Sequence, residues 1–583
     1  MEDLPEGSHS ASRVLDNDAP STNGGDDPWN ALARSRLALV SAPFETENPA
    51  IVDESRHKLD ADILAIQRAL SAFCQHRNSL APISRIPVEI LAFVFSFLAI
   101  SEPPVLKRGV GQPGWMKVTE VSHRWRSAAF ENPRLWTRIP AHALNARWIR
   151  EMAARSKSVP LALSYESTTD MNDDKTRAVL EHMHQTRDLS ISTPHHVPTD
   201  LQKAISARAP MLENLDVVLD TTTRVVSATL SVTVMFTPGG PTYGIPVNAF
   251  ADHAPKLRRV CLRDCAMSWT PSAFKALTHL EITRPHSNRH NELAYSTLEM
   301  LQGLAQMPEL EVLLVAYTFP PWNTRAPLHA DVRVSLPKMA KFILQGEMRT
   351  CLAFVSRFTF PDTAYILLHL DEEGYSRNIP LTPLAPLRPV TYFTLHFPKT
   401  RSLQLTGFAP SGAGCQLAHF SILLTALSDN SAMDLLTGIV ESMPPLSSAE
   451  SFRVTGTVHT FRSSAQWHRL FFSAGSVTRA MVEGANAVSF VEALSPVPAR
   501  GADERGCMLP RLAHLSLKNV PFSDKVHADL GGEPLYAFLP KCMRRRARKG
   551  CRLQELQTES RTFKDYSSLP MEDIVGALLL GEK

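Results

Sequence analysis

Side chains that could bind a metal are present, but their spacing does not complete a metal site. The stretches 182–184 (HMH) and 195–196 (HH) lack acidic or cysteine partners at ligand spacing. Cys261 and Cys265 lie close together, yet no second pair follows at the spacing of a zinc site. We therefore expect the histidines on the surface or in loops. We expect Cys261 to point into the core as a small apolar residue.

The motifs of phosphate binding and catalysis are also incomplete. The stretch 412–415 (GAGC) is not followed by Lys and Ser or Thr, so it is predicted to be a loop and not a phosphate cradle. No Gly-x-Ser-x-Gly elbow occurs, and no order of Ser, His and Asp can be argued from the sequence alone. The expectation is a protein that is not an enzyme and needs no cofactor.

The basic run 541–552 (KCMRRRARKGCR) has two interpretations. It could be a nuclear-localisation or nucleic-acid signal. Apolar residues recur around it at helical spacing, and Gly550 then follows as a left-handed cap. We favour a helix with its Arg and Lys side in water. The apolar positions of this helix are Leu535, Phe538, Leu539, Cys542, Met543 and Ala547.

The composition indicates a folded intracellular protein. Net charge is only +3, from 61 basic and 58 acidic residues, so no global field points to nucleic acid or to an acidic membrane. The eight cysteines are scattered, which favours a reducing compartment. The N-terminus is polar and acidic, unlike a secretory signal, and no apolar run reaches the roughly 18–20 residues of a membrane helix. We predict a cytoplasmic or nuclear protein.

The first 81 residues are predicted to hold a tail and a helix. Residues 1–50 are rich in Ser, Asp, Gly, Asn and Pro, so they are expected to be mostly disordered. Residues 51–81 are expected to form one long amphipathic helix, which Pro82 ends. The apolar stripe of this helix is Leu59, Ile63, Ile66, Leu70 and Phe73.

The stretch 87–100 (PVEILAFVFSFLAI) is the most apolar segment of the chain. It is predicted to be a helix that is apolar on two sides, with Pro87 in its first turn. A loop containing Pro and Gly follows, and helical spacing resumes from Trp115 to Ala129. A short turn opens at Pro133.

The order of these residues resembles the F-box of fungal, mushroom-type F-box proteins. The first half supplies the Ile-Pro-x-Glu-Ile-Leu start at 86–91, and the second half supplies Val-Ser-x-x-Trp-Arg at 121–126 and Pro-x-Leu-Trp at 133–136. Ile86 replaces the usual Leu, and Ser122 stands where Cys is frequent. The domain is placed at 82–140.

The resemblance implies a three-helix module that binds the Skp adaptor of a cullin–RING ubiquitin ligase. The alternative is that the same residues are only the core of a small helical bundle. We favour the core for Val121, Trp125 and Trp136, and the interface for Pro87, Ile90 and Leu91. The adaptor-facing residues that the resemblance implies are Ile86, Pro87, Ile90, Leu91, Phe95 and Trp125.

Residues 141–583 contain a recurring phrase close to Pro-x-Leu-x-x-Leu-x-Leu. It begins near positions 209, 254, 274, 307, 336, 397, 509 and 550. In a repeat array each Leu slot would face inward and meet the next unit, although the spacing here is irregular. The predicted fold is therefore mixed α+β or α/β, with a helical F-box module followed by an irregular leucine-rich-repeat-like solenoid. An ordinary α/β domain remains the alternative.

These features together predict the substrate-recognition subunit of a Skp–cullin–F-box ubiquitin ligase. The F-box would bind the adaptor, and the array would bind an unidentified target protein. A non-catalytic scaffold that acts outside a ligase is the alternative.

Overall fold

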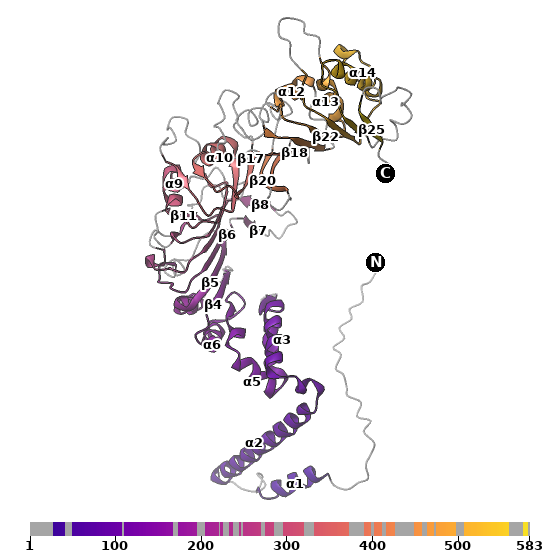
Figure 1. The fold of residues 1–583 in the computed structure, drawn as a ribbon. Helices are drawn as coiled ribbons and strands as arrows, with labels where there is room; N and C mark the ends of the chain where they lie inside the picture. Colours follow the sequence, from indigo (N-terminus) through magenta and orange to yellow (C-terminus); the bar gives the residue numbers. More distant parts are fainter. Residues whose placement is uncertain are drawn as a thin grey trace, which may run out of the picture. The chain divides into compact units, whose positions relative to one another are not determined.

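The computed structural model (Figure 1) describes most of the chain in separate stretches. They divide into two compact units, one of residues up to 93 with 118–128 and one of 94–117 with residues from 129 onward. The described stretches are 27–40, 49–107, 110–166, 173–194, 205–220, 222–225, 233–236, 244–245, 249–269, 274–284, 295–319, 332–371, 390–397, 402–410, 416–425, 448–456, 463–471, 474–496, 507–558 and 575–580.

The first unit contains two helices where the sequence predicted a disordered tail and one helix. The long helix α2 (Pro49–Ser79) agrees with the prediction for 51–81. Helix α1 (Pro28–Leu37) contradicts the predicted disorder in that stretch, because the Asp27 side chain caps it and Pro28 occupies its first turn. Residues 1–26 and 41–48 of the predicted tail lie outside the described residues.

The F-box region is built from short helical elements. These are η1 (Pro82–Arg85), α3 (Val88–Ser101), η2 (Gly114–Lys117), α4 (Val118–Val121), α5 (His123–Glu131) and η3 (Pro133–Trp136). Between α3 and η2, where the sequence predicted a loop, β1 (Val105–Lys107) pairs antiparallel with β2 (Val110–Gln112).

The second unit is dominated by one large, mostly parallel sheet. Among the described strands, β3 pairs only with β4 and β25 only with β24, so the sheet is open. In spatial order its strands are β3 (Arg138–Pro140), β4 (Leu161–Glu166), β5 (Thr186–Pro194), β6 (Asn214–Asp220), β10 (Arg259–Arg263), β12 (His279–Thr283), β13 (Val312–Ala316), β15 (Lys341–Glu347), β17 (Tyr365–Asp371), β20 (Gln416–Thr425), β19 (Leu403–Pro410), β18 (Tyr392–Phe397), β21 (Ser451–Gly456), β22 (Arg479–Glu483), β23 (His514–Lys518), β24 (Glu555–Thr558) and β25 (Ala577–Leu580).

The recurring Leu phrases account for much of this sheet. The eight phrases end in β6, β10, β12, β13, β15, β19, β23 and β24. Alternate residues of a strand point to opposite faces, and the Leu slots are the buried ones, as in the alternating burial of β15 and β23. The mixture of helices and strands is thus as expected, whereas a leucine-rich-repeat solenoid stays a prediction.

One strand of the sheet runs the other way. β19 is antiparallel to both of its neighbours, β18 and β20, and β17 pairs with β20 and not with the next strand in sequence. β19 comes from a Leu phrase that we predicted to be one more unit of the irregular array. The pattern of apolar positions is the same for either strand direction, which is why the sequence did not distinguish them.

Helices pack against this sheet and bury one of its faces. Helix α10 contacts β15 and β17, and α13 contacts β22. The helices of this unit are α6 (Ala146–Ser156), α7 (Asp173–Glu181), α9 (Thr297–Ala305), α10 (Met348–Val355), α12 (Ser464–Leu470), α13 (Asn486–Leu494) and α14 (Leu535–Arg548).

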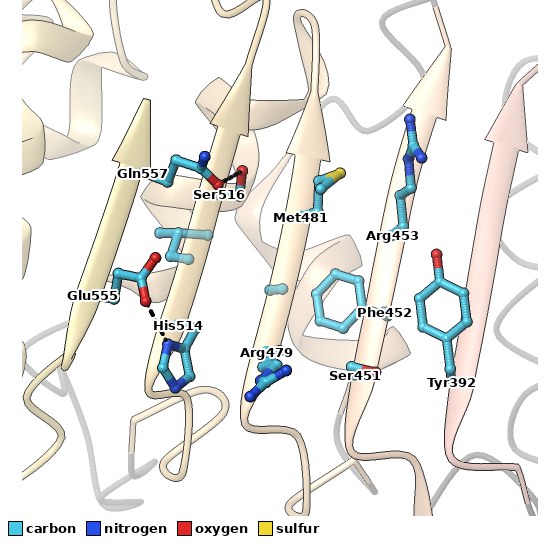
Figure 2. A pocket seen from close by; sticks show the side chains of 12 residues that line it. Tyr392, Ser451, Phe452, Arg453, Arg479, Met481, His514, Ser516, Glu555 and Gln557 are labelled. Carbon is cyan, nitrogen blue, oxygen red and sulfur yellow. Dashed lines mark hydrogen bonds and ion pairs between the residues drawn. The ribbon is translucent and has the colours of Figure 1, made fainter. Parts of the chain in front are cut away.

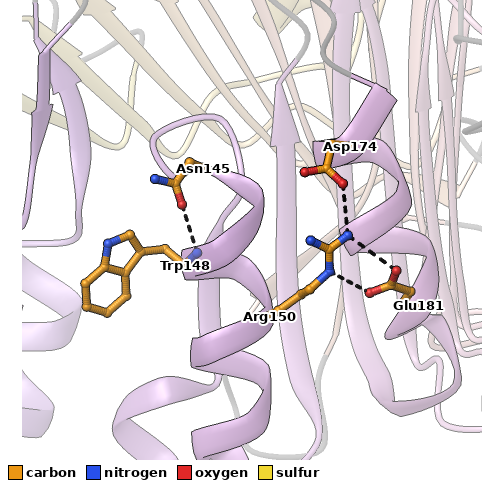
Figure 3. Close-up of polar contacts among 5 residues, drawn as sticks. All are labelled: Asn145, Trp148, Arg150, Asp174 and Glu181. Atoms are coloured by element: carbon orange, nitrogen blue, oxygen red, sulfur yellow. Dashed lines mark hydrogen bonds and ion pairs between the residues drawn. The ribbon is translucent and has the colours of Figure 1, made fainter.

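Polar contacts join the first two of these helices (Figure 3). Asn145 caps α6 by accepting a hydrogen bond from the backbone N–H of Trp148 at 2.9 Å. Arg150 of α6 donates to Asp174 at 3.1 Å and to Glu181 at 2.8 Å, both on α7. Its hydrogen bond lowers the pKa of Glu181. Arg150 therefore fixes the register of α6 on α7.

No helix in the described part of the chain is long and apolar enough to cross a membrane.

Candidate protein-binding site

Helix α3 has one buried side and one exposed side. Leu91 and Phe95 are 2% and 0% exposed, whereas Ile90, Phe93 and Phe97 are 53%, 61% and 60% exposed. At about 100° per residue, Ile90, Phe93, Phe97 and Ile100 fall on one face. We call these four residues the α3 stripe. Large apolar side chains exposed along one helix face mark an interaction site.

This division of α3 changes the set of predicted adaptor-facing residues. Ile90 and Pro87 are exposed, and Ile86 is half-buried, so all three remain accessible. Leu91 and Phe95 belong to the buried side, so the structure corrects their assignment to the exposed surface. The physical reason is their position on the helix, which is roughly 100–140° away from Ile90. Adaptor binding by any of these residues stays a prediction.

Arg124, which the sequence did not indicate as a site residue, stabilises the turn that precedes α3. The guanidinium of Arg124, on α5, donates to the backbone carbonyls of Ser84 and Ile86. The Ser84 hydroxyl in turn donates to the carbonyl of Asn78 at 2.6 Å. Since carbonyls in an irregular turn lack helical partners, Arg124 satisfies them and fixes the turn that precedes Pro87.

Of the three core residues predicted in the second half of the F-box motif, only Trp136 is fully buried. Trp125 is half-buried, and its backbone N–H is bound by the Ser122 hydroxyl at 3.2 Å. Val121 is 56% exposed, so its prediction as a core residue is wrong. Val121 ends the short helix α4, and the turn before α5 leaves its side chain facing outward.

Trp136 is a core residue, as predicted. It is buried, and its indole N–H donates to the carbonyl of Ala129 at 2.8 Å. The Trp115 ring lies 5.0 Å away, edge to face. The guanidinium of Arg155 lies over the Trp136 and Phe130 rings at 4.5 and 4.1 Å. Trp136 therefore anchors η3 to Ala129 and to Arg155 of α6 within the second unit.

A second candidate surface lies on the polar side of the sheet (Figure 2). There side chains of β18, β21, β22, β23 and β24 line a shallow pocket of about 260 Å³. His514 contacts Glu555 at 3.1 Å, and Ser516 donates to Gln557 at 3.1 Å. The exposed Arg479 stands in the same row of the sheet as His514. Of these five strands only β23 and β24 end a Leu phrase, so the sequence did not indicate that these residues lie together.

Residues with metal-binding side chains do not gather in the described part of the chain. No group of three or more His, Cys, Asp or Glu side chains that could hold a metal ion occurs there. Cys261 is buried, but it alternates with Val260 and Leu262 on β10 and lies on the other face, 3.8 Å from Glu281. Its exposure of only 6% agrees with the expectation that Cys261 is a small buried residue. Positions 195–196 and 412–415 lie outside the described residues.

Residues 541–548 of the basic run form the C-terminal part of α14. Gly550 follows this helix with a φ of +79°, as expected of a left-handed cap. The predicted apolar side is buried from Leu535 to Met543. One basic residue departs from the prediction of a solvated face. Arg546 is fully buried and donates to the carbonyls of Met508 and Leu509 at 2.8 and 2.9 Å.

Comparison with known families gives a match in the region that contains helix α3. A family model described as F-box-like matches residues 83–140, which contain α3, α5 and η3. These residues are an F-box-like domain. F-box domains generally bind Skp-type adaptors, so this domain indicates a role in protein–protein interaction of the Skp–cullin–F-box type. A search of curated proteins found no match to the chain.

Proposed function

We propose that this protein is a substrate-recognition subunit of a Skp–cullin–F-box ubiquitin ligase. The observation that carries the proposal is the exposed α3 stripe within the F-box-like domain at 83–140. The stripe would bind the Skp adaptor by apolar burial. Ile86, Pro87 and Trp125 would contribute at its margin, and Leu91 and Phe95 would support the helix from behind. The chain itself would present a target and carry out no chemistry.

A double substitution in the α3 stripe tests adaptor binding. We expect Phe93→Asp with Phe97→Asp to weaken co-purification with a Skp-type adaptor by roughly 100-fold or more, because each lost aromatic anchor costs about 2 kcal/mol. Both side chains are exposed, so the fold is expected to survive. Leu91→Ala is a poorer test, because it would also open a cavity in the buried side of α3.

The matched control for this experiment is Trp148→Asp. Trp148 is a partly exposed aromatic residue on α6, outside the F-box-like domain. It should leave adaptor binding unchanged. Full adaptor binding by the Phe93→Asp, Phe97→Asp variant would show that the α3 stripe does not bind the adaptor.

The polar side of the sheet is the proposed target-binding surface. We infer that the Leu phrases build a leucine-rich-repeat-like array, supported by their parallel pairing and by the burial of their Leu slots. The polar slots of β18 and β21–β24 then form one continuous surface, which includes Tyr392, Arg453 and Arg479. Such an array would hold a target at a fixed distance from the adaptor.

Affinity purification followed by mass spectrometry tests both adaptor binding and target binding. The unmodified chain should recover adaptor, cullin and target together. Arg479→Glu with Tyr392→Ala should lose the target and keep adaptor and cullin, because both residues line the pocket on the polar face. Recovery of the adaptor without any cullin would instead favour a scaffold outside a ligase.

A further inference from the structure

Helix α2 carries an apolar seam that its own described surroundings do not bury. None of its 31 residues is buried, and Ile63, Ile66 and Leu70 are 52%, 62% and 61% exposed. Most of the stability of a protein helix comes from packing of its apolar face. A helix of this length with its apolar face in water therefore requires a partner.

The spacing of this seam is that of a coiled coil. Val52, Leu59, Ile66 and Phe73 follow one another at intervals of seven residues. A second series at the same interval lies between them: Arg56, Ile63, Leu70 and Arg77. Two series with a seven-residue repeat, offset by three and four, form the seam of a two-stranded coiled coil. The partner that fits is thus another helix with the same repeat.

Helix α1 covers only one edge of the seam. The Trp29 ring lies 5.6 Å from the Phe73 ring, and Arg36 pairs with Asp62. Both contacts are at the edge of α2 that holds Phe73 and Asp62, since Ile63 and Leu70 are rotated roughly 60–100° from that edge. The opposite edge, with Ile63 and Leu70, remains exposed.

The charges of α2 select the orientation of the partner. Residues 49–63 contain four acidic and two basic residues, and residues 64–79 contain two arginines and no acidic residue. The first half is therefore net negative, even with Arg36 paired to Asp62, and the second half is net positive. An antiparallel pair of two α2 helices places opposite charges together, whereas a parallel pair places like charges together.

We propose that α2 is a homodimerisation helix that pairs antiparallel with α2 of a second copy of this chain. Ile63 would pack on Ile66 of the second copy, and Leu59 on its Leu70. Arg56 would then lie against the Phe73 ring of the second copy. A parallel pair would instead place Arg56 on Arg56 and Arg77 on Arg77 within the seam. This inference does not depend on adaptor or target binding.

The mass of the full chain in solution tests the dimer. Light scattering should give twice the 64.6 kDa of one chain for the unmodified protein. Ile63→Asp with Leu70→Asp should give one chain, and Leu64→Asp, an exposed leucine on the far side of α2, should remain dimeric. A monomeric unmodified chain, or a double variant that stays dimeric, would overturn the proposal.

Disulfide formation tests the orientation. A copy with Leu59→Cys is mixed with a differently tagged copy with Leu70→Cys, both with Cys74→Ser. An antiparallel pair should form the mixed disulfide between the two tags. Disulfides only between identical copies would show a parallel pair and overturn the antiparallel assignment.

Discussion

The buried guanidinium of Arg546 shows how the position of one residue on a helix decides its environment. Arg546 stands four residues after Cys542 and seven after Leu539, on the buried side of α14. Its bond to the carbonyl of Leu509 supports a residue with a φ of +51°, which is a strained conformation for Leu. The helical spacing contained this information, but the length of the basic run favoured a uniformly solvated face.

Replacing Arg546 should therefore be costly. We expect Arg546→Ala to lower the free energy of unfolding by about 3 kcal/mol, because it leaves buried carbonyls unsatisfied and opens a cavity. Arg544→Ala, at an exposed position two residues away, should change it by less than about 0.5 kcal/mol. Urea unfolding followed by tryptophan fluorescence measures both. Equal effects of the two variants would contradict the structural role of Arg546.

Two buried thiols give a prediction that depends on pH. Burial raises the pKa of Cys265 and of Cys542 to about 12, from an ordinary value of 9.0. The folded chain therefore holds these protons more tightly than the unfolded chain does. The resulting stabilisation is complete below about pH 9 and is lost as the pH rises towards 12.

The same burial should protect these thiols from alkylation. At mildly alkaline pH, iodoacetamide should modify the partly exposed Cys551 of the folded chain and leave Cys265 and Cys542 unmodified until urea is added. Peptide mass spectrometry reads out each site. Modification of Cys542 at the rate of Cys551 in the folded chain would show that α14 is not packed as described.

Among the elements, strands that end a Leu phrase could be predicted and several others could not. The phrase combines a Pro that ends the previous helix with alternating apolar slots, and each of the eight phrases leads into a strand. The strands β17, β20 and β25 contain apolar residues but lack that entry signal.

Helix α3 shows the limit of the same approach for the candidate site. Helical spacing alone predicts two apolar sides, with Ile90, Leu91 and Phe95 on one side and Phe93 and Phe97 on the other. The structure groups Ile90 with Phe93 and Phe97. Helix α3 has few polar residues to mark its outer face, so the tertiary packing decides which side is exposed.

The reversed strand β19 predicts an intolerant glycine. A Cβ atom on Gly407 would lie 2.3 Å from the Phe420 ring and 2.9 Å from Val390. We expect Gly407→Ala to lower stability by about 2 kcal/mol, since the overpacked strand must shift. Gly475→Ala is the control, because nothing lies within 4 Å of its Cβ position. Thermal unfolding of the two variants should differ, and identical midpoints would argue against the β19–β20 register.

For the whole molecule, we expect the α2 seam to determine dimerisation and the α3 stripe to determine adaptor binding, each independently of the other. Phe93→Asp with Phe97→Asp should lose the adaptor and stay dimeric. Ile63→Asp with Leu70→Asp should become monomeric and keep the adaptor. Light scattering and co-purification on the same preparations measure both properties. Loss of both dimerisation and adaptor binding in either variant would show that the α2 seam and the α3 stripe depend on each other.

The pairing of β17 with β20 also has a consequence for synthesis of the chain on the ribosome. Forty-five positions separate Asp371, at the end of β17, from Gln416, at the start of β20. At about 5–20 residues per second, the hydrogen-bonding edge of β17 waits roughly 2–9 seconds for its partner. During that interval a nascent chain exposes an open sheet edge, which invites pairing with other chains. The reversed strand thus sets the moment in synthesis when a chaperone is most useful.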